Sequence, residues 1–200
     1  MPASGLEDIY KRLSDKTVGI AGAGGLGSNC AVALARAGVG KLIIADFDTV
    51  SPENLNRQYF FADQTGMKKI AALRENIKRA NPGTQVEAYD LMLDPSNIPV
   101  IFKSCQIIIE AFDLAVMKQM IAETVLSQMD DKYLILGSGV AGFGRNNLIR
   151  TTAPNEKIFV CGDQENETSP AMPPLAPRVG IVAHMQANQA LEILLSLSGT

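Results

Sequence analysis

Short apolar runs alternate with helical patterns along the first two thirds of the chain. Runs that are apolar at nearly every position are typical of strands that a parallel sheet buries on both faces. They occur over residues 17–22, 41–46, 84–90, 105–111 and 133–139. Because crossovers between parallel strands are right-handed, the order predicts an α/β fold with a Rossmann-like, doubly wound and mostly parallel sheet.

Apolar residues at steps of three and four predict the helices between these strands. The stripes are Leu26, Cys30, Leu34 and Ala37, then Ile70, Leu73, Ile77 and Ala80, and then Met117, Ile121, Val125 and Met129. The second of these helices is expected to end at the "NPG" of residues 81–83, where proline cannot continue the turn and glycine accepts a positive φ.

The pattern changes after residue 140. The apolar stretches "NLIRTT" (147–152) and "KIFVCG" (157–162) have no helix between them, which favours antiparallel pairing. The segment 162–178 contains four prolines and almost no apolar pattern, so it is expected to be a long exposed loop. The chain closes with a predicted helix that is apolar around most of its circumference, in which His184 is expected to be a buried packing residue.

Length and composition agree with a single folded domain over residues 1–200, since 46% of the residues are hydrophobic and 20% are charged. A net charge of -3 provides no general basic field for nucleic acid or anionic membranes. The cysteines Cys30, Cys105 and Cys161 have no CxxC spacing, which argues against a disulfide framework and a cysteine zinc site. With no signal-like or membrane-spanning stretch, a soluble cytoplasmic protein is expected.

The stretch "GIAGAGGLGS" (19–28) carries the first candidate chemistry. A turn between a buried strand and a helix needs glycine so that backbone N–H groups can approach a phosphate. Four glycines can serve this purpose, and they are Gly22, Gly24, Gly25 and Gly27. Asp46, at the end of the next strand, lies where an acid accepts ribose hydroxyls. The loop therefore predicts an adenosine nucleotide without choosing between NAD and ATP, and a glycine turn used only for packing is the alternative.

The segment "DFDTVSPENLNRQYFFADQTGMKK" that begins at Asp46 favours a triphosphate over a hydride donor. It carries Asn54, Arg57 and Lys69 in a largely irregular stretch, and cationic side chains suit phosphate oxygens. Asp113 follows the apolar strand at 105–111 and adds a carboxylate at the same sheet edge, where it can hold Mg²⁺. A nicotinamide-dependent oxidoreductase is the alternative, although no suitable Tyr-Lys pair or poised histidine is present as its proton donor.

Together these motifs resemble a known family. The "AGAGGLGS" loop, D-F-D, N-x-x-R-Q, "GMKK", "EAFD" and the terminal "PRVGIVAHMQANQALEIL" look like the ubiquitin-activating superfamily. More narrowly, the chain resembles the short ThiF-like sulfur carrier adenylyltransferases of thiamine biosynthesis, from about residue 13 to the carboxyl terminus. The combination of motifs in this order is more specific than any one of them.

The resemblance implies roles for the candidate residues. Asp46 would bind the ribose, and Asn54 and Arg57 would hold the triphosphate. Lys69 would lie against the phosphates at the reacting centre, and the spacing from Gly66 selects it over Lys68. Asp113 matches the family aspartate that serves Mg²⁺ and catalysis. Leu114, which follows it, departs from the asparagine that is usual in the family.

The resemblance also implies the reaction. A small ubiquitin-like carrier such as ThiS would be joined through its carboxy-terminal glycine to AMP, with ATP and Mg²⁺ as cofactors and without zinc, by a homodimer. Arg12 could supply the arginine that family members donate to the partner's site, or it could lie on a solvated helix face. Cys161 could bond to the carrier or end a strand. A molybdopterin-type carrier, a small molecule or tRNA base as acceptor, and a non-catalytic carrier-binding relative remain alternatives.

Overall fold

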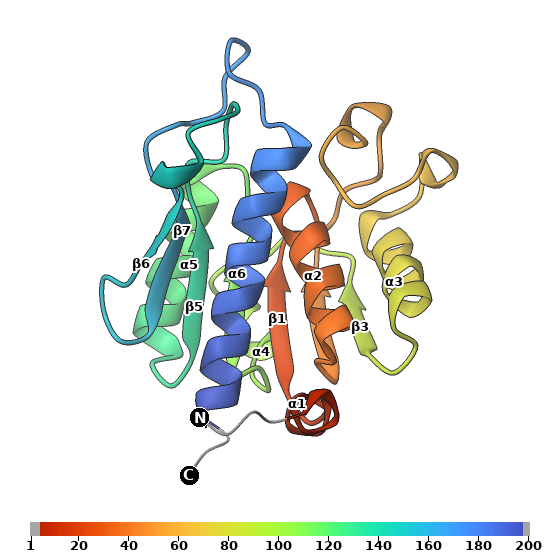
Figure 1. Cartoon of the computed structure of the whole chain (residues 1–200), viewed down its shortest axis with the longest axis vertical. Helices are drawn as coiled ribbons and strands as arrows, with labels where there is room; N and C mark the ends of the chain where they lie inside the picture. Colours follow the sequence, from red (N-terminus) through yellow and green to blue (C-terminus); the bar gives the residue numbers. More distant parts are fainter. Residues whose placement is uncertain (1–4, 198–200) are drawn as a thin grey trace.

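The computed structural model describes residues 5–197 and contains one seven-stranded sheet in the order β3-β2-β1-β4-β5-β7-β6 (Figure 1). The strands are β1 (Thr17–Ala21), β2 (Lys41–Ala45), β3 (Gln85–Tyr89), β4 (Ile107–Glu110), β5 (Tyr133–Gly137), β6 (Arg150–Thr152) and β7 (Ile158–Gly162). All neighbouring strands pair in parallel except β6 and β7, which pair antiparallel. The predicted fold class is therefore confirmed.

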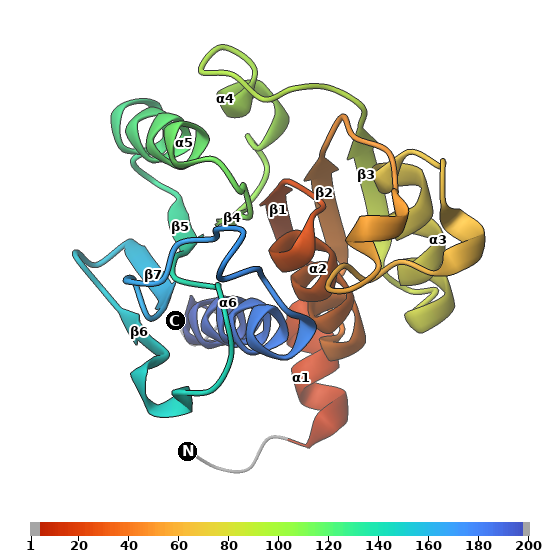
Figure 2. The same cartoon turned by 90° about the horizontal axis from the view of Figure 1, so that it is seen from above.

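Helices cover both faces of this sheet. They are α1 (Leu6–Leu13), α2 (Gly25–Ala37), α3 (Lys69–Ala80), α4 (Ile98–Ile101), α5 (Ala115–Gln128) and α6 (Ala176–Leu197), with short 3-10 turns η1 (Pro52–Asn54), η2 (Ala62–Gln64) and η3 (Asn146–Leu148). Seen from above, α2, α3 and α6 lie on one face, and α4 and α5 lie on the other (Figure 2). None of the helices within residues 5–197 is long and apolar enough to cross a bilayer.

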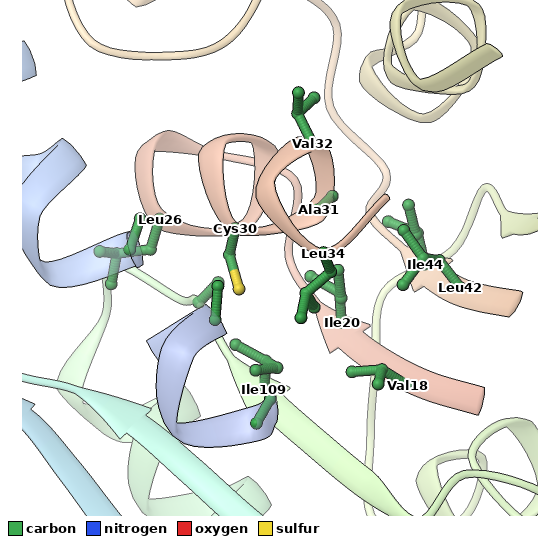
Figure 3. Close-up of a cluster of buried hydrophobic side chains, with 14 of the residues drawn as sticks. Val18, Ile20, Leu26, Cys30, Ala31, Val32, Leu34, Leu42, Ile44 and Ile109 are labelled. Carbon is green, nitrogen blue, oxygen red and sulfur yellow. The ribbon is translucent and has the colours of Figure 1, made fainter. Parts of the chain in front are cut away.

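The core consists of two hydrophobic clusters, one on each face of the sheet. In the larger cluster the α2 residues Leu26, Cys30 and Leu34 are buried along one stripe of the helix, on the side that faces Ile20 and Ile109 of the sheet (Figure 3). This is the stripe that helical spacing predicts. The contacts of this stripe with the sheet hold the start of α2 close to the carboxyl end of β1.

The strand order reverses between β1 and β4, because the chain winds outward from β1 to β3 and then returns to the other side of β1. Open α/β sheets bind ligands at the carboxyl ends of the strands at such a switch point. The loops that follow β1, β2 and β4 meet there.

The last helix, α6, buries the predicted face of Ala183, Ala187, Ala190 and Leu194. The expectation that His184 is buried was wrong. His184 is exposed on the outward stripe shared with Ile181 and Asn188, and its Nδ1 lies 2.7 Å from the carbonyl oxygen of Gly180. An apolar helix still presents one stripe to solvent when only one of its sides meets the sheet.

Candidate functional site

The glycine loop forms a tight turn between β1 and α2. Gly22 has a φ of 100°, and its N–H donates to the carbonyl oxygen of Ala45 at 2.9 Å. A side chain on Gly27 would overlap the carbonyl oxygen of Gly22. Gly24 is the N-cap of α2, and no side chain caps the helix start at Gly25. The first N–H groups of α2 thus lack a side-chain acceptor, as anion-binding helix starts require.

Asp46 lies directly beside this loop. Its Oδ2 accepts the Ala23 N–H at 2.7 Å, and its Oδ1 accepts the Asp48 N–H at 2.8 Å. Each carboxylate oxygen has a second lone pair, so the group can accept further hydrogen bonds. Its position next to the loop is the one that ribose recognition requires, and that role stays a prediction.

Arg57 also reaches the glycine loop. Its Cγ would lie 3.6 Å from a Cβ placed on Gly25, and its carbonyl oxygen accepts a hydrogen bond from Asn29 Nδ2 at 2.9 Å. Nη1 of the guanidinium donates to the Glu53 carbonyl oxygen at 3.0 Å and to Asn56 Oδ1 at 2.7 Å. Within residues 5–197, Arg57 forms no ion pair with a carboxylate. Its charge is therefore available to an anion.

Asn54 ends the 3-10 turn that leads to Arg57. Its Oδ1 accepts the Ser51 N–H at 3.2 Å, and its carbonyl oxygen accepts the Gln58 N–H at 2.9 Å. The side chain thus holds the shape of the segment before Arg57. A direct contact of Asn54 with the triphosphate stays a prediction.

The two neighbouring lysines occupy different environments. Lys69, the first residue of α3, is buried, and its Nζ pairs with Asp48 Oδ2 at 2.7 Å. Lys68 is the N-cap of α3, and its half-exposed side chain donates to Asp90 Oδ1 at 3.0 Å, after the end of β3, and to the Phe47 carbonyl oxygen at 2.8 Å. The Asp48 N–H donates to Asp46 Oδ1, so Lys69 is linked to the glycine loop through Asp48 and Asp46.

Asp113 follows β4 in a loop that touches the glycine loop. A Cβ on Gly22 would lie 2.9 Å from the carbonyl oxygen of Ala111. Asp113 is exposed, and in the described part of the chain it has no ion pair and no side-chain hydrogen bond. No group of three acidic, histidine or cysteine side chains suited to a metal is found within residues 5–197. Mg²⁺ is commonly held by one or two carboxylates together with substrate phosphates. A metal role for Asp113 stays a prediction.

A buried ion pair supports the Asp113 loop. Glu110 is fully buried, and Lys118 Nζ donates to its Oε1 at 2.8 Å, to its Oε2 at 2.9 Å and to the Gly137 carbonyl oxygen at 2.8 Å. Glu110 Oε1 also accepts the Phe112 N–H at 2.6 Å. Burial raises the pKa of Glu110, and the Lys118 ammonium opposes that shift. The pair ties the ends of β4 and β5 to α5.

Sequence reasoning assigned no role to two side chains in this region. Asp48 is the partner of Lys69 and belongs to the D-F-D motif. Gln58 is buried, its Nε2 would lie 3.9 Å from a Cβ on Gly24, and its Oε1 has no hydrogen-bond partner. Asp48 is part of D-F-D and Gln58 is part of N-x-x-R-Q. Membership of these motifs was the signal in the sequence that could have identified them.

The cysteines lie away from solvent. Cys161 is fully buried in β7, with its Sγ 3.5 Å from Thr151 Oγ1, and burial raises the pKa of its thiol. Burial likewise raises the pKa of Cys30 and raises that of Cys105 to about 12. A buried neutral thiol is a poor nucleophile, so the geometry favours the strand-end interpretation of Cys161 over a covalent link to a carrier.

Arg12 lies at the other end of the sheet. Its guanidinium donates to the carbonyl oxygen of Leu195 near the end of α6, and α1 lies below the start of β1 (Figure 1). Within this chain Arg12 is therefore far from the glycine loop. Its contribution to a partner's site stays a prediction.

The expectation of a long exposed loop over 162–178 was wrong at both ends. Asp163 and Arg178 are buried and form an ion pair, and α6 begins at Ala176. The stretch between them is mostly exposed and rises above the carboxyl edge of the sheet (Figure 1). It meets the glycine-rich segment 137–147 at a bridge between Gly142 and Pro174.

A family model supplies the deciding comparison. The model of the ThiF family matches residues 2–200. The chain belongs to the ThiF family. This confirms the resemblance seen in the motifs, and the carboxyl-edge site described above is that of a ThiF-family chain.

Relatives of this ThiF-family chain include larger proteins. Ubiquitin-like modifier-activating enzyme 5 of Caenorhabditis elegans is 40% identical over 86 residues, which are 43% of this chain and 20% of that enzyme. The adenylyltransferase and sulfurtransferase MOCS3 of Caenorhabditis briggsae is 33% identical over 203 residues, which cover 95% of this chain and 48% of that protein. The chain therefore spans less than half the length of these relatives.

Solved structures share the fold. The E. coli tRNA N6-threonylcarbamoyladenosine dehydratase TcdA in complex with ATP superposes with a TM-score of 0.84 at 22% identity, covering 96% of this chain and 90% of TcdA. E. coli MccB with ATP gives a TM-score of 0.72 at 21% identity, covering 93% of this chain and 57% of MccB. At these identities the likeness is one of fold.

Proposed function

We propose that this ThiF-family chain uses ATP to adenylylate the carboxy-terminal glycine of a small ubiquitin-like sulfur carrier of the ThiS type and releases pyrophosphate. The sulfur carried would serve the thiazole of thiamine, and the active form would be a homodimer. The names of two relatives, a ubiquitin-like modifier-activating enzyme and an adenylyltransferase, support the reaction class.

One observation carries the proposal: a series of contacts, some through an intermediate residue, links the candidate residues to the glycine loop. Gly22 abuts the loop of Asp113, Ala23 is bonded to Asp46 and through it to Asp48 and Lys69, and Gly25 packs on Arg57. Two cationic side chains and an unpaired carboxylate thus stand on segments that are linked to the glycine loop before α2. That set is richer in charge than a nicotinamide cofactor needs, and it suits a triphosphate with a metal ion.

The chemistry follows from these charges. The carrier carboxylate is already ionised at neutral pH, so no general base is needed. One of its oxygens forms a bond to the α-phosphorus of ATP, the bond from that phosphorus to the bridging oxygen breaks, and pyrophosphate leaves with the electron pair. Like charges repel during this attack, so Arg57 and Lys69 stabilise the transition state by supplying fixed positive charge.

Asp113 would hold Mg²⁺. The ion would add charge neutralisation at the phosphates. Asp46 would orient the ribose, and the N–H groups of the first turn of α2 would contact phosphate oxygens, while Asn54 would keep Arg57 in place beside the triphosphate.

The test is ATP-pyrophosphate exchange by the purified chain, with and without a ThiS-like carrier that ends in Gly-Gly. Exchange that depends on the carrier is the expected result. A carrier that lacks its last glycine is the matched control and should give none. Absence of carrier-dependent exchange by the intact protein would contradict the proposal.

Additional arms separate the alternatives. In two further assays a molybdopterin-type carrier or bulk tRNA replaces the ThiS-like carrier, to test whether another acceptor supports exchange. The tRNA is included because TcdA is named for a tRNA substrate. Competition by NAD against ATP binding tests the oxidoreductase alternative. Preference for any of these ligands over the ThiS-like carrier and ATP would overturn the specific assignment.

A further inference from the structure

The start of α5 presents apolar side chains to solvent directly after Asp113. Leu114 and Val116 are 58% and 67% exposed, and Ala115 between them is exposed as well. These three residues, 114–116, are called the apolar turn below. A single exposed leucine is ordinary in a folded protein, but consecutive exposed apolar residues indicate a contact surface.

Leu114 is also the N-cap residue of α5, a position for which leucine is poorly suited. Asparagine, aspartate, serine and threonine are preferred there because their side-chain oxygens accept N–H groups of the first helical turn. In the described part of the chain no side chain caps this helix, and its first turn holds no acidic residue. The residue at position 114 therefore sacrifices helix stability, as is expected where a side chain serves a function.

The apolar turn adjoins the candidate nucleotide site. Asp113 precedes it, and the ring of Phe112 lies against the glycine loop, since its Cδ1 would be 3.6 Å from a Cβ on Gly22. The buried Glu110–Lys118 ion pair joins the end of β4 to the beginning of α5. The apolar turn lies between these two residues and is therefore held near the glycine loop.

The charges around the apolar turn do not favour nucleic acid. Between residues 111 and 122 the chain carries one carboxylate, Asp113, and one ammonium, Lys118. The Lys118 Nζ donates to both carboxylate oxygens of Glu110 and to the Gly137 carbonyl oxygen, so its three N–H donors are used. An apolar surface beside a carboxylate, with no cation left over in this stretch, suits a protein and not a phosphodiester backbone.

The proposed reaction brings ATP and an acceptor to this edge of the sheet. ATP and the metal ion present phosphate oxygens and positive charge at the reacting centre, and apolar side chains give these groups no hydrogen bond or counter-charge. The acceptor is the other molecule whose reacting group must come close to the glycine loop. The apolar turn therefore fits the acceptor.

We propose that Leu114 and Val116 bind the acceptor, and that the acceptor is a protein with an apolar side chain near its reacting carboxylate. This role rests on the proposed function, to which it adds the surface that recognises the second substrate. Leu114 departs from the asparagine that is usual in the family, so the contact is a feature of this chain. Leu114 is on this basis a specificity-determining residue.

The functional test compares Leu114→Asn with the wild type in pyrophosphate exchange that depends on the Gly-Gly-ended carrier. Burial of a leucine side chain is worth about a factor of ten or more in affinity, so the KM for the carrier should rise at least about tenfold. The KM for ATP should change less than about twofold, because the substitution leaves the glycine loop intact. Leu126→Asn, at a 55% exposed position near the other end of α5, is the matched control and should leave both KM values unchanged.

The same substitution separates binding from folding. Asparagine is a favoured N-cap, so Leu114→Asn should raise the midpoint of urea unfolding while it weakens the binding of the carrier. A purely structural role of Leu114 would give no such opposition. Val116→Gln leaves the N-cap unchanged and is the second variant: it should raise the KM for the carrier without raising the unfolding midpoint.

Calorimetry of carrier binding in the absence of ATP is the second measurement. Burial of apolar surface gives a negative change in heat capacity, which should be less negative for Leu114→Asn than for the wild type. The Kd for the carrier should rise at least about tenfold. This measurement does not require adenylylation.

Unchanged KM and Kd values for the carrier in Leu114→Asn would overturn the role of the apolar turn and leave the proposed function intact. If the wild type binds the carrier without exchange, and Leu114→Asn weakens that binding, the proposed function fails and the role of the apolar turn stands. A wild type that does not bind the carrier would overturn both. If sedimentation shows that Leu114→Asn turns a dimer into a monomer while the Kd for the carrier stays unchanged, the apolar turn contacts a second copy of the chain and the proposal is wrong.

Discussion

Lys69 Nζ and Asp48 Oδ2 form an ion pair at 2.7 Å in which the lysine side chain is 8% exposed, whereas the neighbouring Lys68 is 45% exposed and pairs with Asp90 instead. Two adjacent lysines thus differ in burial and in the carboxylate with which they pair. This difference makes them a matched pair for mutation.

Lys69→Ala should lower the rate of carrier-dependent pyrophosphate exchange about a hundredfold, since loss of one electrostatic contact to the transition state costs ~3 kcal/mol. Lys68→Ala should lower it less than about fivefold, because exposed ion pairs contribute ~0–1 kcal/mol. The exchange rates of the two variants, measured at saturating ATP, test this difference. Equal losses in the two variants would remove the special role of Lys69.

Asp113→Asn should raise the Mg²⁺ concentration needed for half-maximal exchange at least about tenfold, since weakened metal sites typically lose 10–100-fold in affinity. Asp113 is exposed and unpaired in the described structure, so the free energy of unfolding should change by no more than about 0.5 kcal/mol. A Mg²⁺ titration of both proteins measures the first effect. Asp130→Asn, at an exposed position after α5, serves as the control, and an unshifted titration for Asp113→Asn would contradict its metal role.

Gly27→Ala should destabilise the fold by about 1–3 kcal/mol, because the added methyl group would overlap the Gly22 carbonyl oxygen. Gly180→Ala is the matched control: no atom lies within 4 Å of its added Cβ, and alanine is favoured over glycine within a helix by about 0.5–1 kcal/mol. The midpoint of urea unfolding should fall for Gly27→Ala and rise for Gly180→Ala. If Gly27→Ala left the free energy of unfolding unchanged, the backbone of the turn would have shifted to accommodate the methyl group.

Lys118→Met should destabilise the fold by about 3 kcal/mol, since it leaves the fully buried Glu110 without its cationic partner. The double variant Glu110→Gln/Lys118→Met should recover much of this loss, because no unpaired charge remains. Lys103→Met, at an exposed position, should be close to wild type. Failure of the double variant to recover stability would show that packing of Lys118, not its charge, is what matters.

The Asp163 carboxylate is expected to stabilise the fold by an amount that depends on pH. Burial alone would raise the pKa of Asp163, but the Asn166 and Glu165 N–H groups, the Asn166 side chain and the Arg178 guanidinium outweigh it and hold the pKa below its ordinary value. A depressed pKa means that the unfolded chain binds the proton more tightly, so the contribution is complete above about pH 4 and is lost as the pH falls below that.

The measurement is urea unfolding of wild type and Asp163→Asn between pH 7 and pH 3. The wild type should be more stable at pH 7, and the difference should narrow below about pH 4. A difference that stays constant across this range would contradict the depressed pKa.

Much of the fold follows from local patterns. The apolar runs specified all five predicted parallel strands, and the helical stripe specified the buried face of α2. This is because the spacing of apolar residues along an element determines which of its faces is buried. The glycine loop and Asp46 could also be placed in advance, since parallel strands bring their carboxyl ends to one edge.

Contacts between segments that are distant in sequence emerge only from the packing of the folded chain. His184 points outward because only one side of α6 meets the sheet, and Asp163 meets Arg178 across a loop whose composition indicated only exposure. Lys68 and Lys69 are identical in type and adjacent, yet Lys68 is the N-cap with a non-helical backbone (φ -59°, ψ 132°) and Lys69 is the first helical residue, and only Lys69 pairs with Asp48. Local patterns of residues thus specify the elements and the nucleotide loop, and packing between distant segments specifies which side chains meet at that loop.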